Sequence, residues 1–246
     1  MSFDTLSPLL ALLCGSAALT AALSGALGMG GGSLLLVIWA GLLPARETLA
    51  LHGLNQGVAN GSRAWMLRRH IRWQVVGWQL AGAALAAGLL AWLRFTPSTL
   101  GIFLALGLLP LVVALIPRRL RPGVETWWGG LLCGLLTTGA QLSVGSSGPL
   151  LDTFYLRGGL GRREVVATKA FTQSVGHALK VLYYGAALWA PAGLGWGVAP
   201  VLVAALLGTW IGRRILEAMS ERAFLSLTRW LTAGLSIYAL ARAATL

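Results

Sequence analysis

Long apolar runs recur along the whole chain and are separated by short polar links. Most runs have the length of helices, and they hold too few polar residues to form a solvated face. Several approach the roughly 20 residues that an α-helix needs to cross a bilayer. Helices are predicted at 6–22, 31–43, 47–67, 74–93, 98–116, 124–138, 148–156, 164–185, 195–211 and 222–242. The pattern therefore predicts an all-α polytopic membrane protein.

Two of these segments are too short to cross a bilayer. At about 1.5 Å per residue, 31–43 and 148–156 would be roughly 20 Å and 13 Å long, against a hydrocarbon core of roughly 30 Å. Each follows a glycine-rich break, "GMGGGS" in the first case and "VGSSGP" in the second. We expect the helices to restart at Ser33 and at Pro149, whose ring suits the first turn of a helix.

The sequence is internally repetitive. A shift of 117 positions aligns glycine, alanine, acidic and amide residues. Upstream, "LLCG" at 12–15 recurs at 131–134 with a shift of 119, so the two registers differ by two residues inside the break. The aligned pairs are Gly28 with Gly145, Gly31 with Gly148, Gly41 with Gly158, Glu47 with Glu164, Ala50 with Ala167 and Gln56 with Gln173. We therefore expect two copies of one unit, 1–117 and 118–246, within one membrane domain.

Charge is concentrated in the links between the apolar runs. The net formal charge is +12, but 57% of the residues are hydrophobic, 11% are charged and the mean hydropathy is +0.75, which argues against a nucleic-acid-binding protein. By the positive-inside rule, the arginine-rich links are predicted to be cytoplasmic and the arginine-poor links periplasmic. The first group is 63–73, 117–123, 157–163 and 212–222, and the second is 94–97 and 186–194. This orientation predicts two inverted repeats, each an interrupted helical hairpin plus three transmembrane helices, with both termini in the periplasm.

The glycine-rich breaks are candidates for an anion site. Their backbone groups cannot face lipid, so a break must be buried in protein or line a wet cavity. A restarted helix presents free N–H groups and a positive dipole end, which suit an anion. The candidate residues are Gly30, Gly31, Gly32, Ser33, Ser146, Ser147 and Gly148. The alternative is that these glycines only let helices pack closely.

Each helix that follows a hairpin carries one polar stripe. The stripes are His52, Asn55, Gln56, Asn60 and Arg63, and, at the same spacing, Lys169, Thr172, Gln173, His177 and Lys180. Polar groups within a membrane usually face a cavity, so the stripes are expected to line the transport pathway. Gln56 and Gln173 fall about 14 Å along their helices, near the bilayer midplane. Asn55, Lys169 and Thr172 complete the predicted substrate-binding set.

The titratable residues of these segments leave alternatives open. His52 and His177 are either proton carriers or satisfied hydrogen-bonding groups. Asp152 is expected to pair with a nearby arginine, and otherwise to join the histidines in proton coupling. Arg63 and Lys180 are expected to snorkel toward the helix ends.

The interrupted segments also carry a family resemblance. In "GALGMGGGSLLLVIWAGLLPARETLALHGLNQGVAN" (25–60) and "GSSGPLLDTFYLRGGLGRREVVATKAFTQSVGH" (145–177), the chain resembles the sulfite exporter TauE/SafE family, also called the toluene sulfonate uptake permeases. The resemblance implies a multi-pass carrier of the bacterial inner membrane. Its substrates would be small sulfur oxyanions such as sulfite, thiosulfate, sulfoacetate or other organosulfonates. In one departure, "LLLV" follows the first break, where a proline is expected as in the second.

Two other classes of function compete with an anion transporter. Ser147 and His177 could be the nucleophile and base of an intramembrane serine protease, although the first repeat has no serine at the matching position. Cys14 and Cys133 could form a transmembrane thiol relay, which would need a reactive and accessible pair. No metal or cofactor is expected. The expected partners are a small anion and the lipid bilayer, with no nucleic acid, and a homo-oligomer is compatible with the sequence.

Overall fold

The computed structural model describes residues 3–27, 31–117, 122–155, 159–189, 194–218 and 221–246. This part of the chain holds ten α-helices and no strand, so the all-α prediction is confirmed. The first five are α1 (Phe3–Leu27), α2 (Gly31–Ala40), α3 (Ala45–Met66), α4 (Trp73–Trp92) and α5 (Thr99–Leu115). The other five are α6 (Trp127–Val144), α7 (Gly148–Tyr155), α8 (Arg162–Tyr184), α9 (Val198–Ala218) and α10 (Glu221–Ala243). Short 3₁₀ turns, η1 (Arg68–His70), η3 (Gly185–Trp189) and η4 (Gly195–Gly197), lie between helices.

The two predicted breaks separate α1 from α2 and α6 from α7. Gly145 ends α6 in the left-handed region, with φ of 83°, a conformation that glycine adopts without steric penalty. The helices restart at Gly31 and Gly148, two residues before Ser33 and one before Pro149. The predicted restarts were therefore slightly late, because glycine was treated as part of the break, whereas it can also begin a helix. Pro149 does lie in the first turn of α7.

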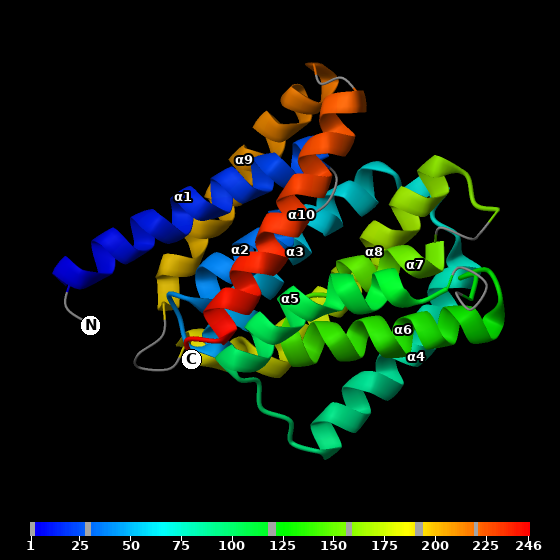
Figure 1. The fold of residues 1–246 in the computed structure, drawn as a ribbon, viewed down its shortest axis with the longest axis horizontal. Coiled ribbons are helices and arrows are strands. Elements are labelled where there is room, and N and C mark those ends of the chain that lie inside the picture. The colour runs from blue at the N-terminus through cyan, green and yellow to red at the C-terminus, as the bar shows by residue number, and fades with distance from the viewer. Residues whose placement is uncertain (1–2, 28–30, 118–121, 156–158, 190–193, 219–220) are drawn as a thin grey trace.

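Each long helix packs against one main partner: α1 against α9, α4 against α6, α3 against α8 and α5 against α10 (Figure 1). In Figure 1, α1 with α9 and α4 with α6 flank the central α3 and α8. If each of α1 to α5 is matched in chain order with α6 to α10, so that α1 corresponds to α6 and α5 to α10, the same set of pairs results. The α1–α9 contact then corresponds to the α6–α4 contact, while α3–α8 and α5–α10 each correspond to themselves.

Glycine allows the flanking helix pairs to pack closely. A Cβ atom on Gly208 of α9 would collide with the carbonyl of Ala18 in α1. A Cβ atom on Gly134 of α6 would collide with the carbonyl of Gln79 in α4. At both positions a side chain would push the two helices apart, which fixes how the flanks close around the centre.

The outer surface is apolar. In the described part of the chain, Trp73–Trp92 and Gly195–Gly212 are long and apolar enough to cross a membrane, and Pro8–Ser24, Gly31–Ala40 and Thr99–Leu115 are shorter apolar helical segments. Large apolar side chains such as Leu85 and Leu207 are exposed on these helices, as lipid contact requires. Tryptophans near the helix ends are exposed, as interfacial anchors would be: Trp65, Trp73, Trp92, Trp127, Trp128, Trp189 and Trp196.

Candidate anion site

A cavity of about 180 Å³ lies where the two helix breaks meet the central helices α3 and α8. The breaks contribute Gly32, Ser33, Gly145, Ser146, Ser147 and Gly148 to its lining. The central helices contribute His52, Gln56, Asn60, Arg63, Lys169, Gln173 and His177. Sites for drug-sized ligands span roughly 300 to 1,000 Å³, so this cavity suits a small ligand.

The two breaks meet across the cavity. The hydroxyls of Ser33 and Ser146 lie 3.2 Å apart, within hydrogen-bonding distance. The Gly32 carbonyl accepts a hydrogen bond of 2.8 Å from Nε2 of His52, which connects α2 to α3. Ser147 donates to Oε1 of Gln141 over 3.2 Å, which connects the second break to α6. Hydrogen bonds therefore hold each break against the helices around it.

Most of the predicted residues line this one cavity. They are Gly32, Ser33, Gln56, Ser146, Ser147, Gly148, Lys169 and Gln173, together with His52, His177 and Asp152. Gly30 lies outside the described residues. Gly31, Asn55 and Thr172 are described but do not line it.

The two glycines that begin the restarted helices differ in their surroundings. A Cβ atom on Gly31 would collide with the Thr20 carbonyl and the Ser24 hydroxyl of α1. Nothing lies within 4 Å of a Cβ atom built on Gly148, which lines the cavity. The packing interpretation thus fits Gly31, whereas Gly148 has open space in front of it.

Asn55 and Thr172 lie beside the cavity rather than in its wall. The Asn55 side chain is completely buried, and its Nδ2 has no hydrogen-bond partner among the described residues. Thr172 donates to the carbonyls of Thr168 and Lys169 in its own helix. It also borders a void of about 10 Å³ beside Gln173.

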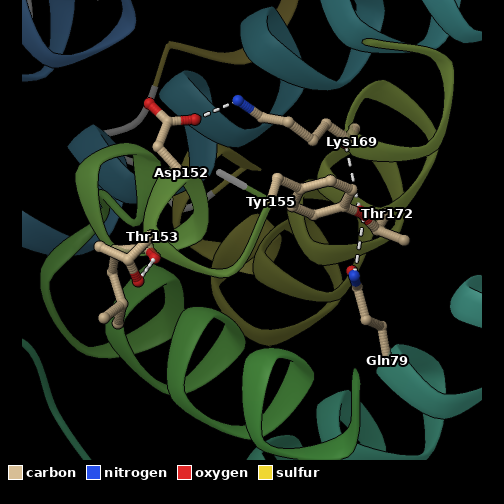
Figure 2. A network of polar contacts seen from close by, with 7 residues as sticks. Gln79, Asp152, Thr153, Tyr155, Lys169 and Thr172 are labelled. Atoms are coloured by element: carbon tan, nitrogen blue, oxygen red, sulfur yellow. Dashed lines mark hydrogen bonds and ion pairs between the residues drawn. The ribbon is translucent and has the colours of Figure 1, made fainter. Parts of the chain in front are cut away.

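Asp152 of α7 forms an ion pair with Lys169 of α8 (Figure 2). The expected arginine partner was therefore wrong, because the Lys169 side chain of α8 reaches Asp152 instead. Both side chains are about one quarter exposed, at 26% and 25%. Further along α7, the Tyr155 hydroxyl accepts a 2.8 Å hydrogen bond from Gln79 of α4 and lies beside Thr172 (Figure 2). These contacts tie α7 to two neighbouring helices.

Lys180 is buried and does not snorkel. Its side chain is 0% exposed, and its Nζ lies 2.8 Å from Nδ1 of His52 and 3.2 Å from the Gly145 carbonyl. The expectation of a snorkelling lysine failed because α3 covers this end of α8. A Cβ atom on Gly53 of α3 would lie 3.2 Å from Cε of Lys180.

Sequence patterns did not single out Gln141, another cavity residue. It belongs to α6, three residues beyond the predicted end of that segment at 138, and its side chain is buried. Its Nε2 has no hydrogen-bond partner among the described residues, and neither does Nδ1 of His177. A buried polar atom without a partner costs roughly 1–3 kcal/mol, so such atoms in a cavity wall point to a ligand. A polar residue one turn before the helix break was the available signal.

Together these groups form a wall rich in hydrogen-bond donors. Hydroxyls of Ser33 and Ser146, and amides of Gln56, Gln141 and Gln173, face one small space. An anion needs several fixed donors to replace its hydration shell. The arrangement can therefore hold a small oxyanion.

Comparison with known proteins agrees with this chemistry. The family model described as "Sulfite exporter TauE/SafE" matches residues 13–242. The chain belongs to the TauE/SafE family. No curated protein and no solved structure gives a significant match.

TauE/SafE membership makes the chain a membrane transporter of sulfur-containing anions rather than an enzyme. The protease alternative is therefore wrong, and the Ser147 hydroxyl is bonded to Gln141 instead of His177. The thiol relay is also unsupported by the TauE/SafE fold. Cys133 is completely buried beside α4 and α7, whereas Cys14 borders the separate apolar cluster around α1 and α2.

Proposed function

We propose that this TauE/SafE member is a secondary transporter that carries one small sulfur oxyanion at a time by alternating access. The substrate would be sulfite, thiosulfate, sulfoacetate or another organosulfonate, bound between the two helix breaks. The observation that carries the proposal is the single cavity that both breaks and both polar stripes line. The buried and unpartnered Nε2 of Gln141 in that lining supports an occupant that accepts hydrogen bonds, as an oxyanion does, because only an acceptor can satisfy it.

The proposed architecture is a pair of inverted repeats, 1–117 and 118–246. The helix boundaries around the breaks support it, since α1 and α6 end, α2 and α7 begin, and α3 and α8 begin at positions that differ by 117. The exchange of packing partners between the two halves supports it too. Inverted repeats with broken helices allow one half to rock against the other and open a midplane site to either face.

The proposed orientation places both termini in the periplasm of a bacterial inner membrane. It rests on the arginine-rich links, which the positive-inside rule assigns to the cytoplasm. Single cysteines at Thr96 and His70, in a background without Cys14 and Cys133, test it in intact cells. A membrane-impermeant maleimide should label Thr96→Cys and spare His70→Cys, and the reverse pattern would reject the orientation.

Binding measurements test the location of the site. We expect Gln56→Ala and Gln173→Ala each to weaken binding of the best-bound anion among sulfite, thiosulfate and sulfoacetate about tenfold or more, because each removes a donor. Gln74→Ala is the matched control, since Gln74 is exposed at the start of α4. Calorimetric titration of monodisperse protein gives the affinities. Unchanged affinity in both site variants would place the anion elsewhere.

A further inference from the structure

Lys180 stands out among the cationic residues of the chain. Its side chain is completely buried, and no other described lysine or arginine is buried to this extent. It does not line the cavity, but His52 and His177 do, and the two imidazole rings lie 5.7 Å apart. His52 also contacts Lys180 directly, so the histidines stand between the lysine and the cavity.

The hydrogen bonds around Lys180 define which atom donates. Nε2 of His52 lies 2.8 Å from the Gly32 carbonyl, which can only accept, so Nε2 carries a hydrogen. Nδ1 of the neutral ring then has a free lone pair and accepts from Lys180. The Gly145 carbonyl is the second acceptor. Two acceptors satisfy both N–H bonds of a neutral amine, whereas the third N–H of an ammonium has no acceptor in the described structure.

No carboxylate in the described structure forms an ion pair with Lys180. Of the elements that pack against α8, α3 brings His52, α6 brings uncharged groups, and neither α4 nor η3 has a charged side chain. On α8 itself, His177 lies one turn away and Lys169 about 16 Å away along the axis. Asp152, the acidic residue in the cavity lining, is paired with Lys169.

The other charged groups of α3 are Arg46 and Glu47 in its first turn, about 8 Å along the axis from His52, and Arg63 toward its far end. On α8, Arg163 and Glu164 lie in the first turn, more than about 20 Å along the axis from Lys180, and the Tyr184 hydroxyl, one turn from Lys180, donates to the Leu142 carbonyl. In η1 the charged or titratable residues are Arg68, Arg69 and His70.

We propose that Lys180 takes up one proton together with each bound anion. This inference rests on the proposed function. A buried ammonium without a counter-charge is costly by several kcal/mol, while the neutral amine is already satisfied by His52 and Gly145. An anion in the cavity supplies the missing negative charge, so proton and anion each strengthen binding of the other by the same factor. The unpartnered Nδ1 of His177, which is buried in the cavity wall, independently indicates that a ligand belongs there.

The consequence for transport is proton coupling. In the proposed cycle, Lys180 holds the proton while the anion is bound, so the proton and the anion cross the membrane together. The empty protein then returns with a neutral amine at Lys180. The proton forms one N–H bond on Nζ when the anion enters and leaves from the same atom when the anion departs. His52 keeps the same hydrogen throughout and acts as a positioning residue that accepts from Lys180 and holds the first break through Gly32.

Calorimetry of the wild-type protein tests the inference without any variant. Thiosulfate, sulfate and methanesulfonate serve as probes, because their charge is constant between about pH 6 and 9. This range includes neutral pH and ends below the ordinary pKa of a lysine side chain. Titrations in two buffers with different ionisation enthalpies count the protons taken up. We expect about one proton per anion, and Kd should rise about tenfold per pH unit where the empty protein holds the neutral amine. Binding without proton uptake would overturn the inference but leave the proposed function intact.

Two variants of Lys180 and one control variant test whether Lys180 takes up the proton. Lys180→Arg should bind the anion without proton uptake because its charge is permanent, and Lys180→Met should bind at least tenfold more weakly, also without uptake. His70→Gln is the control for an imidazole outside the cavity and should retain full uptake. Proton uptake that persists in Lys180→Arg or Lys180→Met would overturn the assignment. If neither these three anions nor sulfite and sulfoacetate bind the wild-type protein, the proposed function fails, and this inference fails with it.

Discussion

At the scale of single residues, the state of each buried amide separates structural from ligand-binding positions. Gln79 and Gln141 are buried to the same extent. The Nε2 of Gln79 donates to Tyr155, whereas that of Gln141 has no partner among the described residues. An amide whose hydrogen bonds are made within the protein stabilises the fold. An amide N–H without a partner beside a cavity lowers the stability of the empty protein until a ligand accepts its hydrogen bond.

Substitution of these two glutamines by leucine should therefore affect stability and anion binding differently. Gln141→Leu should lower the melting temperature of the empty protein less than Gln79→Leu does, because it removes an unpaired donor along with the bond from Ser147, and should weaken anion binding about tenfold. Gln79→Leu should lower the melting temperature, since the Tyr155 hydroxyl loses its partner. Thermal unfolding with and without thiosulfate measures both effects. A stability loss in Gln141→Leu equal to that of Gln79→Leu would contradict the assignment.

Much of the cavity wall could be predicted at this scale, because the 3.6-residue period places a whole stripe on one face of each helix. Lys180 belonged to its stripe, yet its depth could not be predicted. That depth depends on the crossing of α3 over α8 at Gly53, a tertiary contact with no local signature. The ion pair between Asp152 and Lys169 could not be predicted for the same reason, because it depends on the position of α7 relative to α8 in the folded protein.

At the scale of elements, the two broken helices share a plan but differ in what their first glycine does. Gly31 packs against α1, and Gly148 faces the cavity. Glycine punctuation located both breaks in the sequence to within a few residues. It could not distinguish packing from cavity lining, because the two glycines are equivalent in the repeat and only the neighbouring helix differs.

Enlarging these two glycines should separate folding from binding. Gly31→Ala should destabilise the protein by about 1–3 kcal/mol, since the added methyl collides with α1 and forces the hairpin apart. Gly148→Leu should fold normally and bind thiosulfate at least tenfold more weakly, because its side chain occupies the cavity. Unfolding curves and calorimetric titrations of both variants provide the comparison. Tight binding by a folded Gly148→Leu protein would contradict the role given to the second break.

At the scale of the whole molecule, residues 1–117 and 118–246 contact each other through corresponding helix pairs, α1–α9 on one flank and α6–α4 on the other. The cavity lies between these flanks, beside α3 and α8. The 117-residue offset in the sequence predicted the matching boundaries of the hairpins and central helices. It could not predict that α1 would pack on α9 and α4 on α6, because flat, small-residue faces define these contacts only after both halves are folded. The central claim is that the shared cavity binds the transported anion.

Anion counterflow in proteoliposomes tests that claim most directly. Vesicles loaded with unlabelled thiosulfate or sulfite should accumulate the radiolabelled anion when they contain wild-type protein or Gln74→Ala. The double variant Gln56→Ala with Gln173→Ala should lose accumulation by about tenfold or more, because one donor from each half is missing. Monodispersity and melting temperature establish that the double variant is folded. Counterflow by the folded double variant at the wild-type rate would show that the anion crosses somewhere other than the cavity between the two helix breaks.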